Sequence, residues 1–184
     1  MRVFVAVVPP APAVEDLDAF LDPRRDVPGP RWLPSAEWHV TLAFMADAPS
    51  RVLEPLVEAL RVVAAGQAPV PIAVSGGGCF PDVTRATVLW AGIAGGEAVA
   101  PLAGGVRSAA AVVGAAPAGG RFRPHLTVAR FPRPVDASRW LHVLDTYTGP
   151  EWIVGEVVVV ESHLPRERGH RPRHDVLARL PLGG

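Results

Sequence analysis

The 184-residue sequence contains a single cysteine, Cys79, and neither lysine nor asparagine. One cysteine excludes an internal disulfide framework and any zinc site built from several cysteines. The 18 basic side chains are therefore all arginine, and 18 acidic residues balance them. A net charge of zero excludes the strong positive field with which some proteins coat nucleic acid nonspecifically. We interpret the absence of lysine as a codon bias of a GC-rich bacterial genome, so a single arginine carries little weight as a functional marker.

Long hydrophobic runs are also missing. The apolar run at residues 3–8 ends at Pro9-Pro10 and is shorter than the roughly 7–15 residues of a signal-peptide core. The alanine- and valine-rich stretch at residues 98–120 contains Arg107, prolines and glycines, whereas a spanning helix needs about 20 apolar residues. We therefore expect a cytoplasmic protein with no membrane segment. Hydrophobic residues make up 49% of the chain, which predicts a sizeable core and argues against disorder.

Strand-like and helix-like patterns alternate along the chain in two similar rounds. Strands are predicted at residues 2–8, 37–44, 70–74, 86–93, 122–131, 152–161 and 174–180, and helices at residues 14–21, 52–63, 97–113 and 137–144. Ser50 is the expected N-cap of the second helix. The segments 22–30 and 75–81 are expected to be loops, the second because of its three glycines. The pattern predicts an α+β fold with antiparallel sheets and two related halves, in one domain covering residues 1–184.

The strongest pattern is a short segment that occurs twice. Residues 39–43 read His-Val-Thr-Leu-Ala, and residues 125–129, about half the chain away, read His-Leu-Thr-Val-Ala. Two chance copies of His-apolar-Thr-apolar in a chain of this length are an event on the order of one in a thousand. Because side chains alternate faces along a strand, the His and Thr of each copy share one face. An approximate two-fold relation between the halves would bring both faces to one groove.

Two opposed imidazoles with two hydroxyls suit the opening of a ribose cyclic phosphate. Of His39 and His125, one would remove a proton from the attacking water while the other protonates the departing ribose oxygen, and an ordinary pKa of about 6.5 suits both tasks. The hydroxyls of Thr41 and Thr127 can donate to the non-bridging phosphate oxygens. No metal or other cofactor is needed, and a metal site on His39 and His125 would require a third ligand. A purely structural pair and a metal site are the weaker alternatives.

The sequence resembles the 2H phosphoesterase superfamily, which is named for its paired His-x-Thr-x motifs. Within it, the chain looks most like the bacterial RNA 2′,3′-cyclic phosphodiesterases, also called 2′–5′ RNA ligases. The resemblance covers nearly the whole chain and rests on residues 2–7, 39–44, 122–130 and 157–162. Met45-Ala46 stands where the family usually has Leu-Gly, a departure that falls in a turn. The resemblance implies a bilobal fold in which two antiparallel sheets with outer helices surround a central cleft.

The resemblance also implies an activity and a role for each motif residue. His39 matches the histidine assigned as proton donor and His125 the one assigned as proton acceptor, while Thr41 and Thr127 match the phosphate-contacting threonines. The implied activity is metal-independent hydrolysis of 2′,3′-cyclic phosphate ends of RNA or oligonucleotides to a 2′-phosphate. Some members also join or cleave 2′–5′ linkages in tRNA halves. We expect a monomer.

Arg130 is a further candidate phosphate ligand, since family members often carry arginine after the second motif. Simple alternation points Arg130 away from the histidine face, so it would need a bulge or a strand end to reach the phosphate. Phe44 has the same phase, which favours packing over contact with a base. The basic segment 166–174 is either a solvated loop or a flap that holds the RNA backbone. His142 and His163 fit no pattern and are interpreted as structural.

Two other functions stay open. An enzyme with the same motifs could act on a small cyclic nucleotide or an ADP-ribose cyclic phosphate, because 2H enzymes differ in the lobes that hold the leaving group. A non-catalytic protein that binds RNA ends would use the histidines only to hold phosphate. Binding alone does not require two opposed titratable groups, so the sequence favours an enzyme and leaves its substrate class open.

Overall fold

The computed structural model describes residues 1–165 and 172–183. Its strands are β1 (Val3–Val7), β2 (Arg31–Trp32), β3 (Val40–Met45), β4 (Val70–Phe80), β5 (Ala86–Ala94), β6 (His125–Val135), β7 (Trp152–Val154), β8 (Glu156–His163) and β9 (Arg173–Pro181). Its α-helices are α1 (Ala11–Leu21), α2 (Leu53–Ala65), α3 (Ala100–Val112) and α4 (Ser138–Asp145). Most of the basic run predicted as a loop or a flap, residues 166–171, lies outside the described residues.

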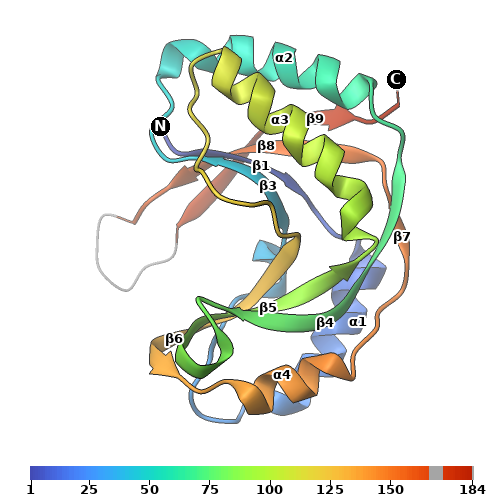
Figure 1. Ribbon diagram of the computed structural model, residues 1–184, viewed down its shortest axis with the longest axis vertical. Coiled ribbons are helices and arrows are strands. Elements are labelled where there is room, and N and C mark those ends of the chain that lie inside the picture. Colours follow the sequence, from blue (N-terminus) through green and yellow to red (C-terminus); the bar gives the residue numbers. More distant parts are fainter. Residues whose placement is uncertain (166–171, 184) are drawn as a thin grey trace.

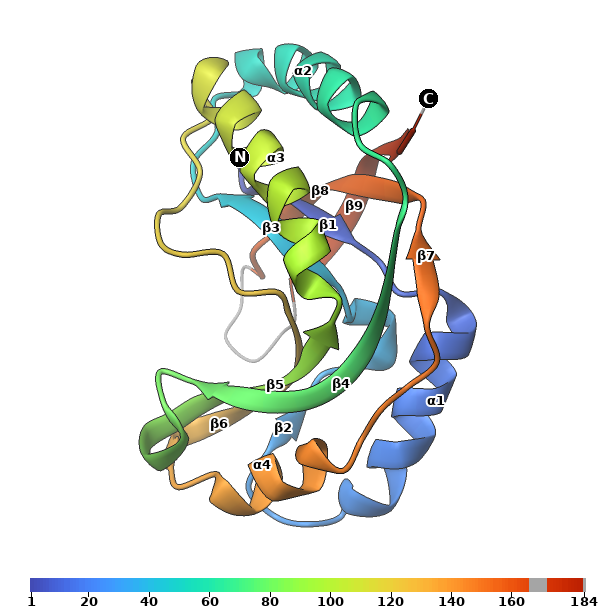
Figure 2. The ribbon, with the colours of Figure 1, turned by 45° about the vertical axis from the view of Figure 1, so that its right-hand side comes forward.

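The strands form one antiparallel path that curls around the centre of the molecule (Figure 1). Among the described residues its order is β7-β4-β5-β6-β3-β1-β8-β9, and the short β2 pairs with β6. We call β3, β1, β8 and β9 the first lobe and β6, β5, β4 and β7 the second lobe. Helices α2 and α3 cover the outside of the first lobe, while α1 and α4 cover the second (Figure 2). The predicted α+β fold, with two lobes and outer helices, is confirmed.

The two lobes meet where β3 pairs with β6, and the pairing consists of Val40 and Leu126. Each of these residues stands between the His and the Thr of its motif. Both side chains are buried, so the neighbouring motif residues project from the opposite face. Because residues that flank an antiparallel pair face one another, the His of each motif lies across from the Thr of the other. The expected approximate two-fold relation therefore passes through this pair.

Each lobe combines segments that are distant in sequence. Helix α1 follows β1 of the first lobe but packs on β4 of the second, and α3 follows β5 of the second lobe but packs on β3 of the first. The prediction of a single strand at residues 152–161 is wrong, because the chain passes from one lobe to the other inside this segment. The chain crosses between the lobes at Gly155, so that β7 pairs with β4 whereas β8 pairs with β1 and β9.

The glycine segment predicted as a loop at residues 75–81 belongs to strand β4 as far as Phe80. Gly78 pairs with Trp90 of β5, and a Cβ atom on Gly78 would lie 2.2 Å from the Trp90 ring. A Cβ atom on Gly77 would lie 2.5 Å from the side chain of Leu144 in α4. These glycines let a ring and a helix lie directly on the strand. The loop prediction is wrong because glycine serves close approach here rather than a turn.

Most of the remaining differences lie at the ends of elements. Strand β3 begins at Val40 rather than at residue 37, because Ser35–Glu37 forms a 3-10 turn. Ser50 is not the N-cap of α2; it begins another 3-10 turn, and α2 follows it without a side-chain cap. Strand β6 begins at His125 and runs beyond the predicted end at residue 131. The two-residue strand β2 was not predicted.

The large hydrophobic core extends through both lobes, between the curled sheet and the helices. A second, small cluster lies on the inner face of the first lobe and consists of Phe4, Ala6, Val158 and Val160, with Phe44 against it. Because Phe4 also stacks on the His39 ring, this cluster forms an apolar floor beneath the first motif.

Gly78→Ala should lower the free energy of unfolding by about 1–3 kcal/mol, because the added methyl group overlaps the Trp90 ring. Gly104→Ala is the matched control. Gly104 is exposed in α3 and an added Cβ would meet no atom within 4 Å, so alanine there should raise the free energy of unfolding by up to about 1 kcal/mol. Urea unfolding followed by circular dichroism measures both. Equal effects at the two positions would contradict the close approach at Gly78.

Candidate active site

A cleft of about 1040 Å³ is lined by residues of both lobes. All five predicted site residues border it, namely His39, Thr41, His125, Thr127 and Arg130. Its lining in the described part of the chain also includes Arg2, Arg31 and a single carboxylate, Glu37. Three guanidinium groups against one carboxylate make the cleft positive, which favours a phosphate-bearing ligand.

The two histidines are held in the same way. His39 Nδ1 lies 2.7 Å from the carbonyl oxygen of Glu37, and His125 Nδ1 lies 2.7 Å from the carbonyl oxygen of Arg123. A carbonyl only accepts hydrogen bonds, so Nδ1 carries a proton in both rings. Nε2 of each ring is therefore left to face a substrate, as a base when neutral and as an acid when protonated.

His39 lies in an aromatic pocket of the first lobe. Its ring stacks on Phe4, with a centroid separation of 4.7 Å and an interplanar angle of 20°. The ring of His174 meets it edge-on at 6.1 Å. Burial lowers the pKa of His39 below its ordinary value, the hydrogen bond to the Glu37 carbonyl opposes that effect, and His174 and His125 lower the pKa further.

His125 has a different aromatic surrounding in the second lobe. Its ring stands edge-on to Phe80 at 4.9 Å and is tilted against Trp90 at 5.7 Å. Burial lowers the pKa of His125 too, while the hydrogen bond to the Arg123 carbonyl raises it and the Arg123 cation lowers it. Burial thus favours the neutral form of both rings, whereas an anion bound between them would favour protonation of one.

Each motif contains a β-bulge at the same place. In β3 the register against β1 shifts by one residue at Leu42, and in β6 the register against β5 shifts in the same way at Val128. Both residues follow the threonine of their motif and are buried. A bulge inserts one unpaired residue and so reverses the face to which the following side chains point.

The bulges bring Phe44 and Arg130 to the cleft. Both residues line it, although alternation alone puts them on the opposite face. Phe44 does pack against the small apolar cluster, but its ring also borders the cleft, which the sequence prediction did not favour. Phe44 and Arg130 occupy equivalent positions in the two motifs, and the Arg2 guanidinium lies over the Phe44 ring, 4.9 Å from its centroid. Each lobe thus presents one guanidinium group to the cleft, from Arg2 in the first lobe and from Arg130 in the second.

Several lining residues were given no role by the sequence analysis. Arg2, Phe4 and Ser162 lie in segments on which the family resemblance rests, but neither the motifs nor the resemblance marked them as site residues. Trp32 belongs to the unpredicted β2. His174, predicted at the junction of the basic segment and the last strand, lies in β9 and borders the cleft. Only the pairing of distant strands brings these residues to the site.

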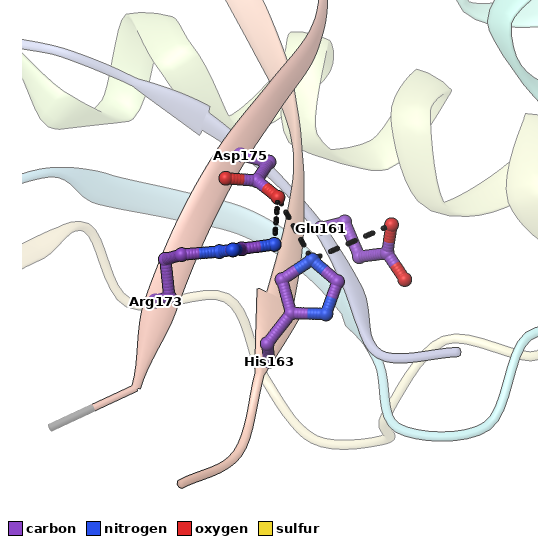
Figure 3. A network of polar contacts seen from close by, with 4 residues as sticks. All are labelled: Glu161, His163, Arg173 and Asp175. Atoms are coloured by element: carbon purple, nitrogen blue, oxygen red, sulfur yellow. Dashed lines mark hydrogen bonds and ion pairs between the residues drawn. The ribbon is translucent and has the colours of Figure 1, made fainter. Parts of the chain in front are cut away.

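His163 belongs to a polar network that joins β8 to β9 (Figure 3). Its Nε2 lies 3.0 Å from Asp175 Oδ2 and 3.7 Å from Glu161 Oε2, and Arg173 donates to the same Asp175 oxygen at 2.8 Å. These contacts support the structural interpretation of His163. His142 is exposed on α4 and does not line the cleft.

In the part of the chain that the structure describes, no three His, Cys, Asp or Glu side chains gather as metal ligands. No helix found there is long and apolar enough to span a membrane. The described cysteine, Cys79, is buried and unpaired, and burial raises the pKa of its thiol.

Comparison with known protein families identifies the family of this chain. The model of a family described as the 2′-5′ RNA ligase superfamily matches residues 8–166. The chain belongs to the 2′-5′ RNA ligase superfamily. The resemblance seen in the paired motifs is therefore confirmed, and both motifs lie within the matched residues.

Relatives with a name or a solved structure extend this comparison. A protein of Aquifex aeolicus named RNA 2′,3′-cyclic phosphodiesterase is 31% identical over 159 residues, which cover 84% of this chain and 82% of that protein. A Geobacillus stearothermophilus protein of the same name is 29% identical over 98% of this chain, but the chain spans only 57% of that protein's length. A solved structure from Thermus thermophilus is 26% identical, with a TM-score of 0.80 over 100% of this chain and 99% of that one.

His39 and His125 should both titrate below 6.5 in the folded protein, because burial disfavours the imidazolium form. The unfolded chain takes up these protons near the ordinary pKa and the folded chain does so only at lower pH. The free energy of unfolding should therefore fall as the pH drops below about 6.5, until the folded pKa values are passed. NMR titration of the ring Cε1–H signals measures the pKa values, and urea unfolding at several pH values measures the linked stability.

Phe4→Ala serves as the control for this titration, because it exposes the His39 ring while leaving the second lobe intact. The pKa of His39 should move back toward its ordinary value, and the pKa of His125 should stay where it is. A His39 pKa at or above 6.5 in the unaltered protein would contradict the burial described.

Proposed function

We propose that this protein hydrolyses the 2′,3′-cyclic phosphate at an RNA end and leaves a 2′-phosphate and a free 3′-hydroxyl. The names of the Aquifex and Geobacillus relatives support this phosphoric diester hydrolase activity. The observation that carries the proposal is the matched pair of Nδ1 hydrogen bonds. These bonds leave two Nε2 atoms, one from each lobe, to serve a phosphate in one cleft as acid and base.

In the proposed step, a water molecule attacks the phosphorus while His125 Nε2 accepts one of its protons. His39 enters the step protonated and donates its Nε2 proton to the departing 3′ oxygen. One P–O bond forms and the P–O3′ bond breaks, and the two rings end with exchanged protonation states that solvent restores. His39 and His125 lie on opposite sides of the Val40–Leu126 pair. This placement supports one acid and one base, because the attacking and leaving oxygens lie on opposite sides of phosphorus.

Thr41, Thr127 and Arg130 would bind the phosphate itself. The threonine hydroxyls donate to the non-bridging oxygens, and the Arg130 guanidinium offsets the charge that those oxygens gain in the transition state. Acid, base and charge stabilisation all come from side chains in this proposal, so no metal ion takes part.

The proposal extends to the kind of substrate and its setting. The cyclic phosphate belongs to RNA or oligonucleotide ends, tRNA fragments among them, and the protein acts on them in the cytoplasm as a monomer. If the 5′-hydroxyl of a second RNA takes the place of water, the same step joins the two chains through a 2′–5′ linkage. Ligation and hydrolysis would therefore share one acid and one base.

His39→Ala and His125→Ala should each lower kcat/KM for a cyclic-phosphate-ended oligonucleotide by about 10²–10⁴-fold. The double variant should be little worse than either single variant, because the two groups act in one step. Chromatography of the 2′-phosphate product measures the rates, and circular dichroism checks folding. His142→Ala, which alters an exposed histidine outside the cleft, is the matched control. Near-normal turnover in either single site variant would contradict the two-histidine mechanism.

Turnover should be the same in EDTA as in added magnesium, manganese or zinc, because side chains supply both proton transfers. The test compares initial rates on the same oligonucleotide after prolonged dialysis against the chelator. Loss of activity in EDTA that a divalent ion restores would overturn this part of the proposal and favour a metal site at the histidines.

A further inference from the structure

A row of three polar side chains crosses the cleft face of the first lobe beside the proposed catalytic site. The backbone N–H of Ser162 in β8 donates to the carbonyl oxygen of Arg2 at 2.8 Å, and Ser162 pairs with His174 of β9. Residues at the same register on neighbouring strands project from the same face of a sheet. Arg2, Ser162 and His174 all line the cleft accordingly.

These three side chains have no polar partner among the described residues. Ser162 is only 9% exposed and lines the cleft, and its hydroxyl has no hydrogen bond to another described residue. The Nε atom of Arg2 is buried without a partner, and its guanidinium lies over Phe44. His174 is exposed, and its ring lies against the rings of Phe4 and His39. Buried polar groups are nearly always hydrogen-bonded, and Arg2 Nε is a buried donor without a partner. Ser162 and the exposed His174 place further donors along the same stretch of the cleft, so the row is suited to a ligand.

The donors in this row match a phosphate group. A guanidinium offers a fork of N–H donors, a serine hydroxyl offers one O–H, and an imidazole offers its N–H. The acidic residues next to this row in sequence, Glu161 and Asp175, lie on the other face, in the network with His163 (Figure 3). Strand alternation therefore leaves the cleft face of this row free of carboxylates.

The row lies next to the proton donor of the proposed reaction. The ring centroids of His174 and His39 are 6.1 Å apart. Consecutive phosphates of an RNA strand are joined through a single ribose. With the cyclic phosphate between His39 and His125, the phosphate on the 5′ side of the same ribose must therefore lie close to the site. The first lobe offers it this row of unpartnered donors.

We propose that Arg2, Ser162 and His174 form a second phosphate subsite, which binds the phosphate on the 5′ side of the terminal ribose. This inference rests on the proposed function. The subsite selects nucleotides that carry a 5′-phosphate or a preceding nucleotide over nucleosides that carry only the cyclic phosphate. The substrate class is thus an oligonucleotide end or a 5′-phosphorylated cyclic nucleotide.

Two substrates that differ only in the 5′-phosphate test the subsite. Adenosine 2′,3′-cyclic phosphate is compared with its 5′-phosphorylated form, and kcat/KM is measured for both. The unaltered protein should prefer the 5′-phosphorylated substrate by about 10–100-fold, the value of hydrogen bonds to a charged group. Inorganic phosphate added together with the unphosphorylated substrate should not replace the missing group. An increase in rate with free phosphate would mean that the subsite binds a separate anion and would overturn the assignment.

Variants then assign the preference to the three residues. Arg2→Met should remove most of it, and Ser162→Ala and His174→Phe should each reduce it by about 3–10-fold, as expected for single hydrogen bonds. His174→Phe keeps a ring against Phe4, which separates hydrogen bonding from packing. The matched control is Arg179→Met, an exposed arginine of β9 that pairs with Glu156 at 2.7 Å. It should keep the full preference. Losses of equal size on both substrates would overturn the subsite.

A binding measurement separates failure of the subsite from failure of the proposed function. Calorimetric titration compares adenosine 2′,5′-bisphosphate with adenosine 2′-phosphate, the products of the two substrates, and needs no turnover. Tighter binding of the bisphosphate that disappears in Arg2→Met supports the subsite even if neither substrate is opened, an outcome that would reject the proposed function alone. Equal affinity for the two products in the unaltered protein would reject the subsite, whatever the catalytic result.

Discussion

The pairing of Val40 with Leu126 is the contact on which the cleft depends. It is the pair through which the two lobes join in the strand path, and both residues are buried. Their apolar side chains fix the opposite orientation for the histidine and threonine on either side of them. One buried pair therefore sets the face, the spacing and the relative direction of both motifs. A polar residue at either position would leave an unpartnered group in the core at the centre of the site.

The two motifs share their backbone conformation, but the side chains around the two histidine rings differ. Each histidine binds the carbonyl two residues before it, and each motif carries a bulge after its threonine. The neighbours then differ: His39 meets Phe4 and His174, whereas His125 meets Phe80, Trp90 and the cation of Arg123. The repeated backbone supplies two identical groups, and their unequal surroundings would allow them to differ as the proposed acid and base.

The sequence was sufficient to predict the parts of the fold that depend on local pattern. Apolar periodicity located the helices, and the doubled His-x-Thr segment located two motifs that share one cleft in the structure. The sequence did not predict the features that depend on pairing between distant strands. The glycines of β4 favour a loop prediction, because the sequence does not show that the Trp90 ring lies on Gly78. The crossing at Gly155 is hidden in a run of strand-forming residues.

The bulges at Leu42 and Val128 show the same limit within the site itself. Strict alternation along a strand takes no account of them, although they decide where Phe44 and Arg130 point. Arg2, Ser162 and His174 stand far apart in the sequence and meet only because β8 lies between the start of β1 and β9. Local pattern carries no information about such a row.

The interleaving of the lobes in sequence has a consequence for the synthesis of the chain. Strand β1, a run of five buried residues, lies between β3 and β8. One of its edges can pair as soon as β3 has been made, but the other must wait until translation, at roughly 5–20 residues per second, reaches β8. An apolar strand with an open edge is a template for association with other chains. The growing chain is therefore most exposed to aggregation on the ribosome, before the first lobe can close.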